Sequence, residues 1–306
     1  MSRGVADSGF PETGATKCAS WDCANARARV AEMNAKFLPS VAAIREGEVD
    51  ALLAELSRSP ALAADRSTCS HPTLMQCLAL DGVDLPLATQ RTMARALLER
   101  GSPIDEPLIA CASVGNLVVG QFLIEAGACL DGRVDLIEGW SPLEEALYWG
   151  QQEMAAVLLA RGARIRNLRT AAGLGQVEQT KRMAENIDQA DVRASVHSPF
   201  GALGREGDAV EQEVLDNALV YAAMGGHCEV AETLCARGAN AASFPAGFHY
   251  RGAPLHWAAH RGHQQTCRTL LTLGADPGAR DLTIEKTAAE WAVHAGHEQL
   301  AAELSW

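Results

Sequence analysis

The stretch that constrains the fold most is residues 251–276, RGAPLHWAAHRGHQQTCRTLLTLGAD. Pro254 stands where a first helix can begin, because a missing N–H costs nothing in the first turn of a helix. Gly262 can end that helix, and a second helix is predicted over 263–272, with Gly274 ending it in the left-handed conformation that glycine tolerates. Two helices this short cannot bury their own apolar faces, so the stretch predicts a stack of similar units.

Glycines at the end of each predicted first helix give a register along the chain. They are Gly47, Gly82, Gly115, Gly150, Gly175, Gly226, Gly262 and Gly296. Five of the seven intervals between them lie between 33 and 36 residues, and in four cases a second glycine follows the first by 12 positions. This period predicts about eight helix-turn-helix repeats between residue 38 and the end of the sequence.

The stretch 251–276 resembles the ankyrin repeat, whose signature is TPLHxAAxxGHxxxVxxLLxxGAD. The matching residues are Ala253-Pro254-Leu255-His256-Trp257-Ala258-Ala259, Gly262-His263, Leu270-Leu271 and Gly274-Ala275-Asp276. The resemblance implies an all-α solenoid with short β-hairpin fingers and a concave face that binds another protein without catalysis. It also assigns His256 to a hydrogen bond with the opening turn, and assigns His227, His263 and His297 to contacts between adjacent repeats.

The predicted organisation has three parts: a flexible tail over 1–19, a capping helix over 20–38 and an ankyrin domain over 39–306. Two insertions beyond the period mark loops on one face of the array. Residues 81–90 are predicted to form an extra loop between two helices. Residues 188–213 are an insertion of loop composition with room for a short helix near Phe200 or Val210. Fingers are expected at 128–140, 239–252 and 275–286.

Charge and cysteine content exclude several classes of partner and compartment. The chain has 26 Lys and Arg against 38 Asp and Glu, a net charge of −12, whereas nucleic acid and anionic membranes require a cationic face. Several of the nine cysteines lie in predicted helices, which favours reduced thiols. The first 19 residues lack the apolar segment of a secretory signal, so we expect a cytoplasmic protein; delivery into another cell as an effector stays open. We also expect the protein to be a monomer.

No motif of catalysis or cofactor binding stands out, so no catalytic residue, cofactor or metal is predicted. Gly201, Gly204 and Gly207 are three apart, which is not the spacing of a phosphate-binding loop. The alternative is a metal or small-molecule site lined by histidines. Its candidate residues are His249, His256, His260 and His294. Against it, Trp257 stands where a zinc-binding HExxH motif has glutamate.

By the resemblance, partners contact the finger tips and the two positions before each first-helix glycine. The predicted contact residues are Trp140, Tyr148, Trp149, Phe248, His249, Tyr250, His260, Arg261 and His294. Aromatic and arginine side chains are the usual anchors of an interface. Two alternatives stay open: these rings pack on one another, or they mediate self-association. Tyr221, Trp257 and Trp291, one repeat apart, are predicted to form a core between repeats.

Overall fold

The structure is a computed structural model that describes residues 33–69, 72–132, 141–187, 208–248 and 250–305. These residues divide into two compact units. The N-terminal unit includes the described residues up to Arg164, and the C-terminal unit includes those from Ile165 onward. Each unit is described by itself.

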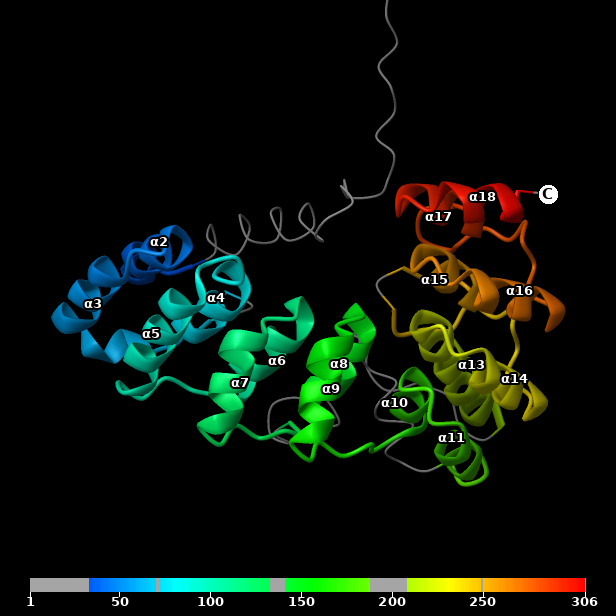
Figure 1. The fold of residues 1–306 in the computed structure, drawn as a ribbon, viewed down its shortest axis with the longest axis horizontal. Coiled ribbons are helices and arrows are strands. Elements are labelled where there is room, and N and C mark those ends of the chain that lie inside the picture. Colours follow the sequence, from blue (N-terminus) through cyan, green and yellow to red (C-terminus); the bar gives the residue numbers. More distant parts are fainter. Residues whose placement is uncertain (1–32, 70–71, 133–140, 188–207, 249, 306) are drawn as a thin grey trace, which may run out of the picture. The chain divides into compact units, whose positions relative to one another are not determined.

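The N-terminal unit stacks short helices in pairs, drawn in blue to green in Figure 1. Its helices are η1 (Ala35–Phe37), α2 (Leu38–Glu46), α3 (Val49–Arg58), η2 (Pro60–Ala63), α4 (Leu74–Asp81), α5 (Leu87–Leu98), α6 (Asp105–Val114), α7 (Leu117–Glu125), α8 (Pro142–Trp149) and α9 (Gln152–Ala160). The first helices α2, α4, α6 and α8 pack in one row, and the second helices α3, α5, α7 and α9 pack in another. Helices this short are unstable alone, so contacts between neighbours hold the unit together.

The C-terminal unit repeats this arrangement, in green to red in Figure 1. Its helices are α10 (Leu168–Gly173), α11 (Val177–Ala184), α13 (Asp208–Gly225), α14 (Cys228–Ala236), α15 (Pro254–His260), α16 (Gln264–Thr272), α17 (Ala288–His294) and α18 (Glu298–Leu304). The first helices α10, α13, α15 and α17 form one row. Leu168, Leu219 and Leu255 occupy the same position of three successive first helices and are at most 1% exposed, so one apolar core runs through the unit.

Glycines end the first helices as the register predicts. Seven of the eight have φ between 70° and 82°, a left-handed conformation that strains any residue with a Cβ atom. Gly82 is the exception, because it follows α4 with φ −96°. The positions of these glycines therefore mark where each first helix ends.

Three first helices begin with a capping box. In α8, the Ser141 hydroxyl accepts a hydrogen bond from the Glu144 N–H at 3.2 Å, and the Glu144 carboxylate accepts one from the Ser141 N–H at 3.0 Å. The same reciprocal pair joins Thr73 to Gln76 in α4 and Thr287 to Glu290 in α17. Gln76, Glu144 and Glu290 stand at the fourth position of the signature, so these three repeats cap the helix with an amide or carboxylate where the signature has a histidine.

Neighbouring repeats are joined by the residue that follows the first-helix glycine. We call this residue a clasp residue where its side chain is hydrogen-bonded to a carbonyl of the preceding repeat. In the N-terminal unit, Asn116 Nδ2 donates to Ala79 O at 3.0 Å and Gln151 Nε2 donates to Ser113 O at 3.2 Å. In the C-terminal unit the clasp residues are histidines: His227 Nε2 lies 3.0 Å from Gly173 O and His263 Nε2 lies 2.9 Å from Met224 O.

These bonds confirm the role assigned to His227 and His263. The His297 ring occupies the matching place, since a Cβ atom on Gly262 would lie 2.6 Å from its Cε1 atom. The clasp residues with a described bond are thus amides, Asn116 and Gln151, in the N-terminal unit and imidazoles, His227 and His263, in the C-terminal unit.

The predicted loop over 81–90 is shorter than expected. Only residues 82–86 lie between α4 and α5, because α5 begins at Leu87 and absorbs the rest of the extra length. Gln90, 1% exposed, donates through Nε2 to Val83 O and Leu85 O at 3.0 and 2.8 Å. The loop is therefore tied to the helix that follows it.

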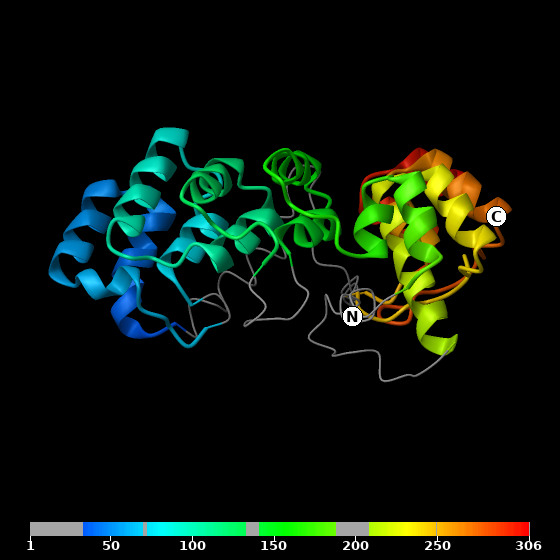
Figure 2. The ribbon, with the colours of Figure 1, turned by 90° about the horizontal axis from the view of Figure 1, so that it is seen from below.

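The predicted insertion 188–213 ends earlier than its composition indicated, because α13 begins at Asp208. Three side chains bind this helix to the segment after α14: Gln212 Nε2 donates to Gly238 O, Asp216 accepts from the Asn240 N–H, and Glu213 accepts from the Ala246 N–H. Figure 2 shows the start of α13, in yellow-green, running past the ends of its neighbours. The rest of the insertion, 188–207, lies outside the described residues.

The predicted fingers and capping helix are only partly covered by the described residues. These contain one isolated antiparallel bridge, between Arg280 and Thr287, and no strand. Residues 239–248 form turns and bends, and 133–140 lie outside the described part. Of the predicted tail and helix, 1–32 lie outside it; in the rest, Asn34 is extended with ψ 134°, the short helix η1 follows, and α2 begins at Leu38.

The outer side of the last first helix differs from its counterparts. Val293 in α17, three residues before its glycine, is 59% exposed. The residues at the same position of the preceding first helices are at most 3% exposed: Ile44, Ala79, Ala112, Leu147, Ala172, Ala223 and Ala259. A Cβ atom on Gly296 would meet no heavy atom within 4 Å, whereas Gly175, Gly226 and Gly262 each have a histidine ring against them.

Candidate functional site

The predicted contact residues of the C-terminal unit gather around Trp291 in α17. The Trp291 side chain is 1% exposed. The centroid of its ring lies 5.2 Å from that of Trp257, and 5.9 Å from those of Tyr250 and His260, all in edge-on geometry. Edge-on pairs of this kind are favourable beyond the area they bury. Trp291 therefore forms a packed floor under two partly exposed side chains, Tyr250 and His260.

A row of rings continues from this floor into the core of the unit. Tyr221, Trp257 and Trp291 are 1%, 6% and 1% exposed, so the structure confirms that they form a core between repeats. Phe248 lies between the first two, with ring centroids 5.9 Å from Tyr221 and 5.6 Å from Trp257. The row thus draws on the segment before α15 as well as on the first helices.

His260 and His294 lie beside one another on the outer edge of this floor. Their rings are stacked, with centroids 6.4 Å apart and planes 13° apart. Both precede a first-helix glycine by two positions, which places them at equivalent points of α15 and α17. Burial, followed by the charges of Arg261, His294 and His297, lowers the pKa of His260 to about 4. Burial also lowers the pKa of His294, so both rings are neutral at pH 7.

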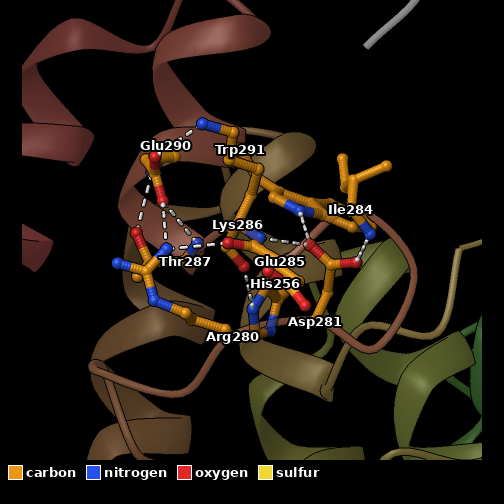
Figure 3. Close-up of polar contacts among 9 residues, drawn as sticks. All are labelled: His256, Arg280, Asp281, Ile284, Glu285, Lys286, Thr287, Glu290 and Trp291. Atoms are coloured by element: carbon orange, nitrogen blue, oxygen red, sulfur yellow. Dashed lines mark hydrogen bonds and ion pairs between the residues drawn. The ribbon is translucent and has the colours of Figure 1, made fainter. Parts of the chain in front are cut away.

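The loop between α16 and α17 holds Trp291 in place through Asp281 (Figure 3). The Asp281 carboxylate is buried and accepts four hydrogen bonds. Oδ1 accepts from the N–H groups of Thr283 and Ile284, both at 2.8 Å. Oδ2 accepts from the Lys286 N–H at 2.8 Å and from the Trp291 indole at 3.1 Å. One carboxylate therefore fixes both the loop and the orientation of the tryptophan.

Further contacts complete this loop. His256 Nε2 lies 3.1 Å from Lys286 O, so the signature histidine is hydrogen-bonded to the opening turn of the next repeat, whereas the resemblance implied a bond to the opening turn of its own repeat. Glu285 has φ +57°, which is uncommon for a residue with a side chain, and Arg280 donates to its carbonyl at 2.7 Å. The Glu290 carboxylate forms an ion pair with the Lys286 ammonium group at 2.9 Å (Figure 3). The loop is pre-organised by these bonds.

Four predicted contact residues come together here and are partly exposed: Tyr250, His260, Arg261 and His294. We call them the helix-end surface. Trp149 lies in the other unit, partly exposed, where its indole donates to the Glu145 carboxylate at 2.8 Å. Trp140 and His249 lie outside the described residues. For Trp149, as for the four, contact with a partner stays a prediction.

Two predicted contact residues are buried, which corrects their assignment to a contact surface. Tyr148 and Phe248 are each 2% exposed. Tyr148 faces the core of the N-terminal unit, with its ring edge-on to Trp149 at 5.2 Å, and Phe248 is enclosed by Tyr221 and Trp257. Each ring is large and lies next to another ring, so packing against that ring is more favourable than exposure to solvent.

The alternative histidine-lined site is not assembled by the described residues. No group of three or more His, Cys, Asp or Glu side chains in that part of the chain is arranged to hold a metal ion. His256 binds a backbone carbonyl through Nε2, and His260 and His294 are stacked rather than convergent. His249, the remaining candidate, lies outside the described residues.

Several structural residues escaped the sequence reasoning. The capping-box partners Gln76, Glu144 and Glu290 follow the pattern of Ser or Thr with Glu or Gln three residues later, which is readable from sequence. The clasp residues Asn116 and Gln151 follow a glycine just as His227 does, so their position in the register was the available signal. Asp281 had no such signal, because its role depends on the fold of one loop.

The comparison with protein families agrees with this geometry. Residues 203–281 match the family model for ankyrin repeats (3 copies). No curated protein matches the chain. Among the described helices, none combines the length and the apolar character needed to cross a bilayer. Ankyrin repeats are generally protein–protein interaction modules and are typically non-catalytic. The match, together with the paired helices and glycine turns, shows that the chain contains ankyrin repeats.

Proposed function

We propose that this chain is a non-catalytic binding protein that holds another protein on the helix-end surface of its C-terminal unit. The observation that supports this most directly is the arrangement around Trp291. Tyr250 and His260 rest on its buried ring, and His294 stacks on His260. Side chains that are already held in place lose little conformational entropy when a partner binds, which favours them as anchors.

The chemistry of the surface favours a protein partner. Tyrosine and arginine anchor interfaces because each combines a large contact area with hydrogen bonding. The neutral imidazoles of His260 and His294 can donate or accept hydrogen bonds. The net charge of −12 disfavours nucleic acid, whose phosphates need a cationic surface.

The test begins with the immobilised full chain, which is used to enrich a binder from lysate of the source cells. The affinity of that purified binder is then measured for Tyr250→Ala, Arg261→Ala and His294→Ala, all at partly exposed positions. We expect at least one variant to bind about tenfold more weakly or worse, with an unchanged melting temperature. Leu87→Ala, at a residue 65% exposed in the other unit, is the matched control. Wild-type affinity in all three variants would rule out this surface.

A further inference from the structure

We infer that the C-terminal unit is the pH-responsive half of the molecule: its histidines make its repeats open in mild acid, while the amide clasp residues keep the N-terminal unit closed. Because the helix-end surface is built on α15 and α17, this opening would also release a bound partner. That second consequence rests on the proposed function. The opening itself does not.

The geometry of the two histidine clasps comes first. A carbonyl can only accept, so Nε2 of His227 and of His263 is the donor to the preceding repeat. Each ring lies against a glycine of that repeat. A Cβ atom would be 2.7 Å from His227 Nδ1 on Gly175, and 2.9 Å from His263 Nδ1 on Gly226. The nitrogen that gains a proton in acid therefore faces the backbone of the neighbouring repeat.

The charged groups around these rings disfavour a further positive charge. Arg261 in its own turn, His227 before α14 and His297 before α18 act on His263. The groups that act on His260 are Arg261, His294 and His297. Arg261 is a cation, and the imidazoles of His227 and His294 gain positive charge in acid. His256 differs, since Asp281 lies near it and favours its charged form. Protonation of the row therefore adds repulsion along the interfaces between repeats.

Burial is the largest cause of the lowered pKa at His227, His263 and His260, and it lowers that of His260 to about 4. Unfolded histidine has a pKa of about 6.5. The folded state therefore binds fewer protons than the open state, so this stability is present above about pH 6.5 and is lost as the pH falls toward the folded value. For His260 alone, the open-to-closed ratio rises about thirtyfold between pH 7.5 and 5.

The N-terminal unit provides the contrast within the same chain. Its clasp residues Asn116 and Gln151 make the same kind of bond, to Ala79 O and Ser113 O, with side-chain amides that do not titrate in this range. Its described residues include no histidine. Lowering the pH from 7.5 to 5 therefore protonates neither of the two clasp residues described in that unit.

The test is hydrogen exchange of the full chain at pH 7.5 and 5.0, corrected for intrinsic exchange rates and resolved by segment. We expect protection in α15 and α16 to fall tenfold or more at pH 5, and protection in α8 and α9 to change less than threefold. The triple variant His227→Gln, His260→Gln, His263→Gln follows the chemistry of Gln151 and should lose most of this response. Equal loss in both units, or a wild-type response in the triple variant, would overturn the inference.

A reverse variant keeps the inference falsifiable if the triple variant does not fold. Asn116→His with Gln151→His places imidazoles at the N-terminal clasps, so protection in α8 and α9 should now fall at pH 5. If it does not, the clasps are not the source of the response. Binding is measured separately with the enriched protein. Opening at pH 5 without loss of binding contradicts the proposed function but leaves the pH response intact. Loss of binding without opening contradicts the pH response but leaves the proposed function intact.

Discussion

The N-terminal and C-terminal units build the same paired helices from different side chains. Both end their first helices with glycine and both use capping boxes, at Ser141 in one and Thr287 in the other. Clasp residues are amides in the first unit and histidines in the second, and the core of the second is rich in aromatic rings. The family match, 203–281, lies in the second. The pair geometry therefore does not depend on whether an amide or an imidazole stands at the clasp.

The largest difference is expected between the two tryptophans. Trp291→Ala removes a buried ring together with its bond to Asp281, so it should destabilise the C-terminal unit by about 3–5 kcal/mol. Trp149→Ala, at a partly exposed ring, should cost the N-terminal unit about 1 kcal/mol. Urea denaturation followed by circular dichroism measures both. Similar losses would mean that the aromatic core is not what distinguishes the units.

The next largest effect is expected from the Asp281 carboxylate in the loop between α16 and α17. Asp281→Asn keeps the shape of the side chain but weakens the bonds accepted from Thr283, Ile284 and Lys286, and should cost about 1.5–3 kcal/mol. Asp276→Asn is the control, because Asp276 is exposed and accepts one bond, from the Gly278 N–H. Thermal melting compares the two. If Asp276→Asn lowered the melting temperature as much as Asp281→Asn, the four hydrogen bonds accepted by Asp281 would add no stability to the loop.

Two glycines compare how readily the side chain that follows the next first-helix glycine can move. Gly262 and Gly115 have φ of 74° and 72°, so alanine strains both by about 1 kcal/mol. A new Cβ on Gly262 meets the His297 ring, whereas on Gly115 it meets the end of the flexible Gln151 side chain. Gly262→Ala should therefore cost about 2 kcal/mol and Gly115→Ala about 1 kcal/mol in denaturation experiments. The opposite order would show that the Gln151 side chain is the stiffer of the two.

The smallest effect should be shared by both units. Ser141→Ala and Thr287→Ala each remove one side-chain acceptor at a helix start and should each cost about 1 kcal/mol. The measurement is again denaturant unfolding, read separately for each unit. A loss confined to one unit would extend the difference between the units to their helix caps.

Much of the fold could be predicted from the sequence because helix ends leave a local mark. A glycine with positive φ, such as Gly150, and a proline in a first turn, such as Pro254, are fixed by backbone geometry within a few residues. The start of α13 could not be predicted in this way. Its first turns are held by bonds to Gly238 and Ala246, which follow it by more than 25 positions.

The candidate site could be predicted only in part, for a related reason. The register identified His260 and His294 as equivalent positions, and the structure stacks them. Exposure was not readable, because whether Tyr148 or Phe248 faces solvent depends on rings that approach it from neighbouring elements. Residues that act through the fold, such as Asp281, leave no pattern in the sequence.

The outer side of α17 has a consequence for building with this protein. Val293 and Gly296 stand at the positions that the following repeat covers in α15, where Ala259 is buried and the His297 ring lies against Gly262; in α17 the apolar side chain is exposed and a Cβ atom on the glycine would meet no heavy atom within 4 Å. A designer could therefore extend the array by grafting one more helix pair after α18, with a histidine or glutamine placed to reach the His294 carbonyl. Lengthening at this point needs a new repeat, but no redesign of the old ones.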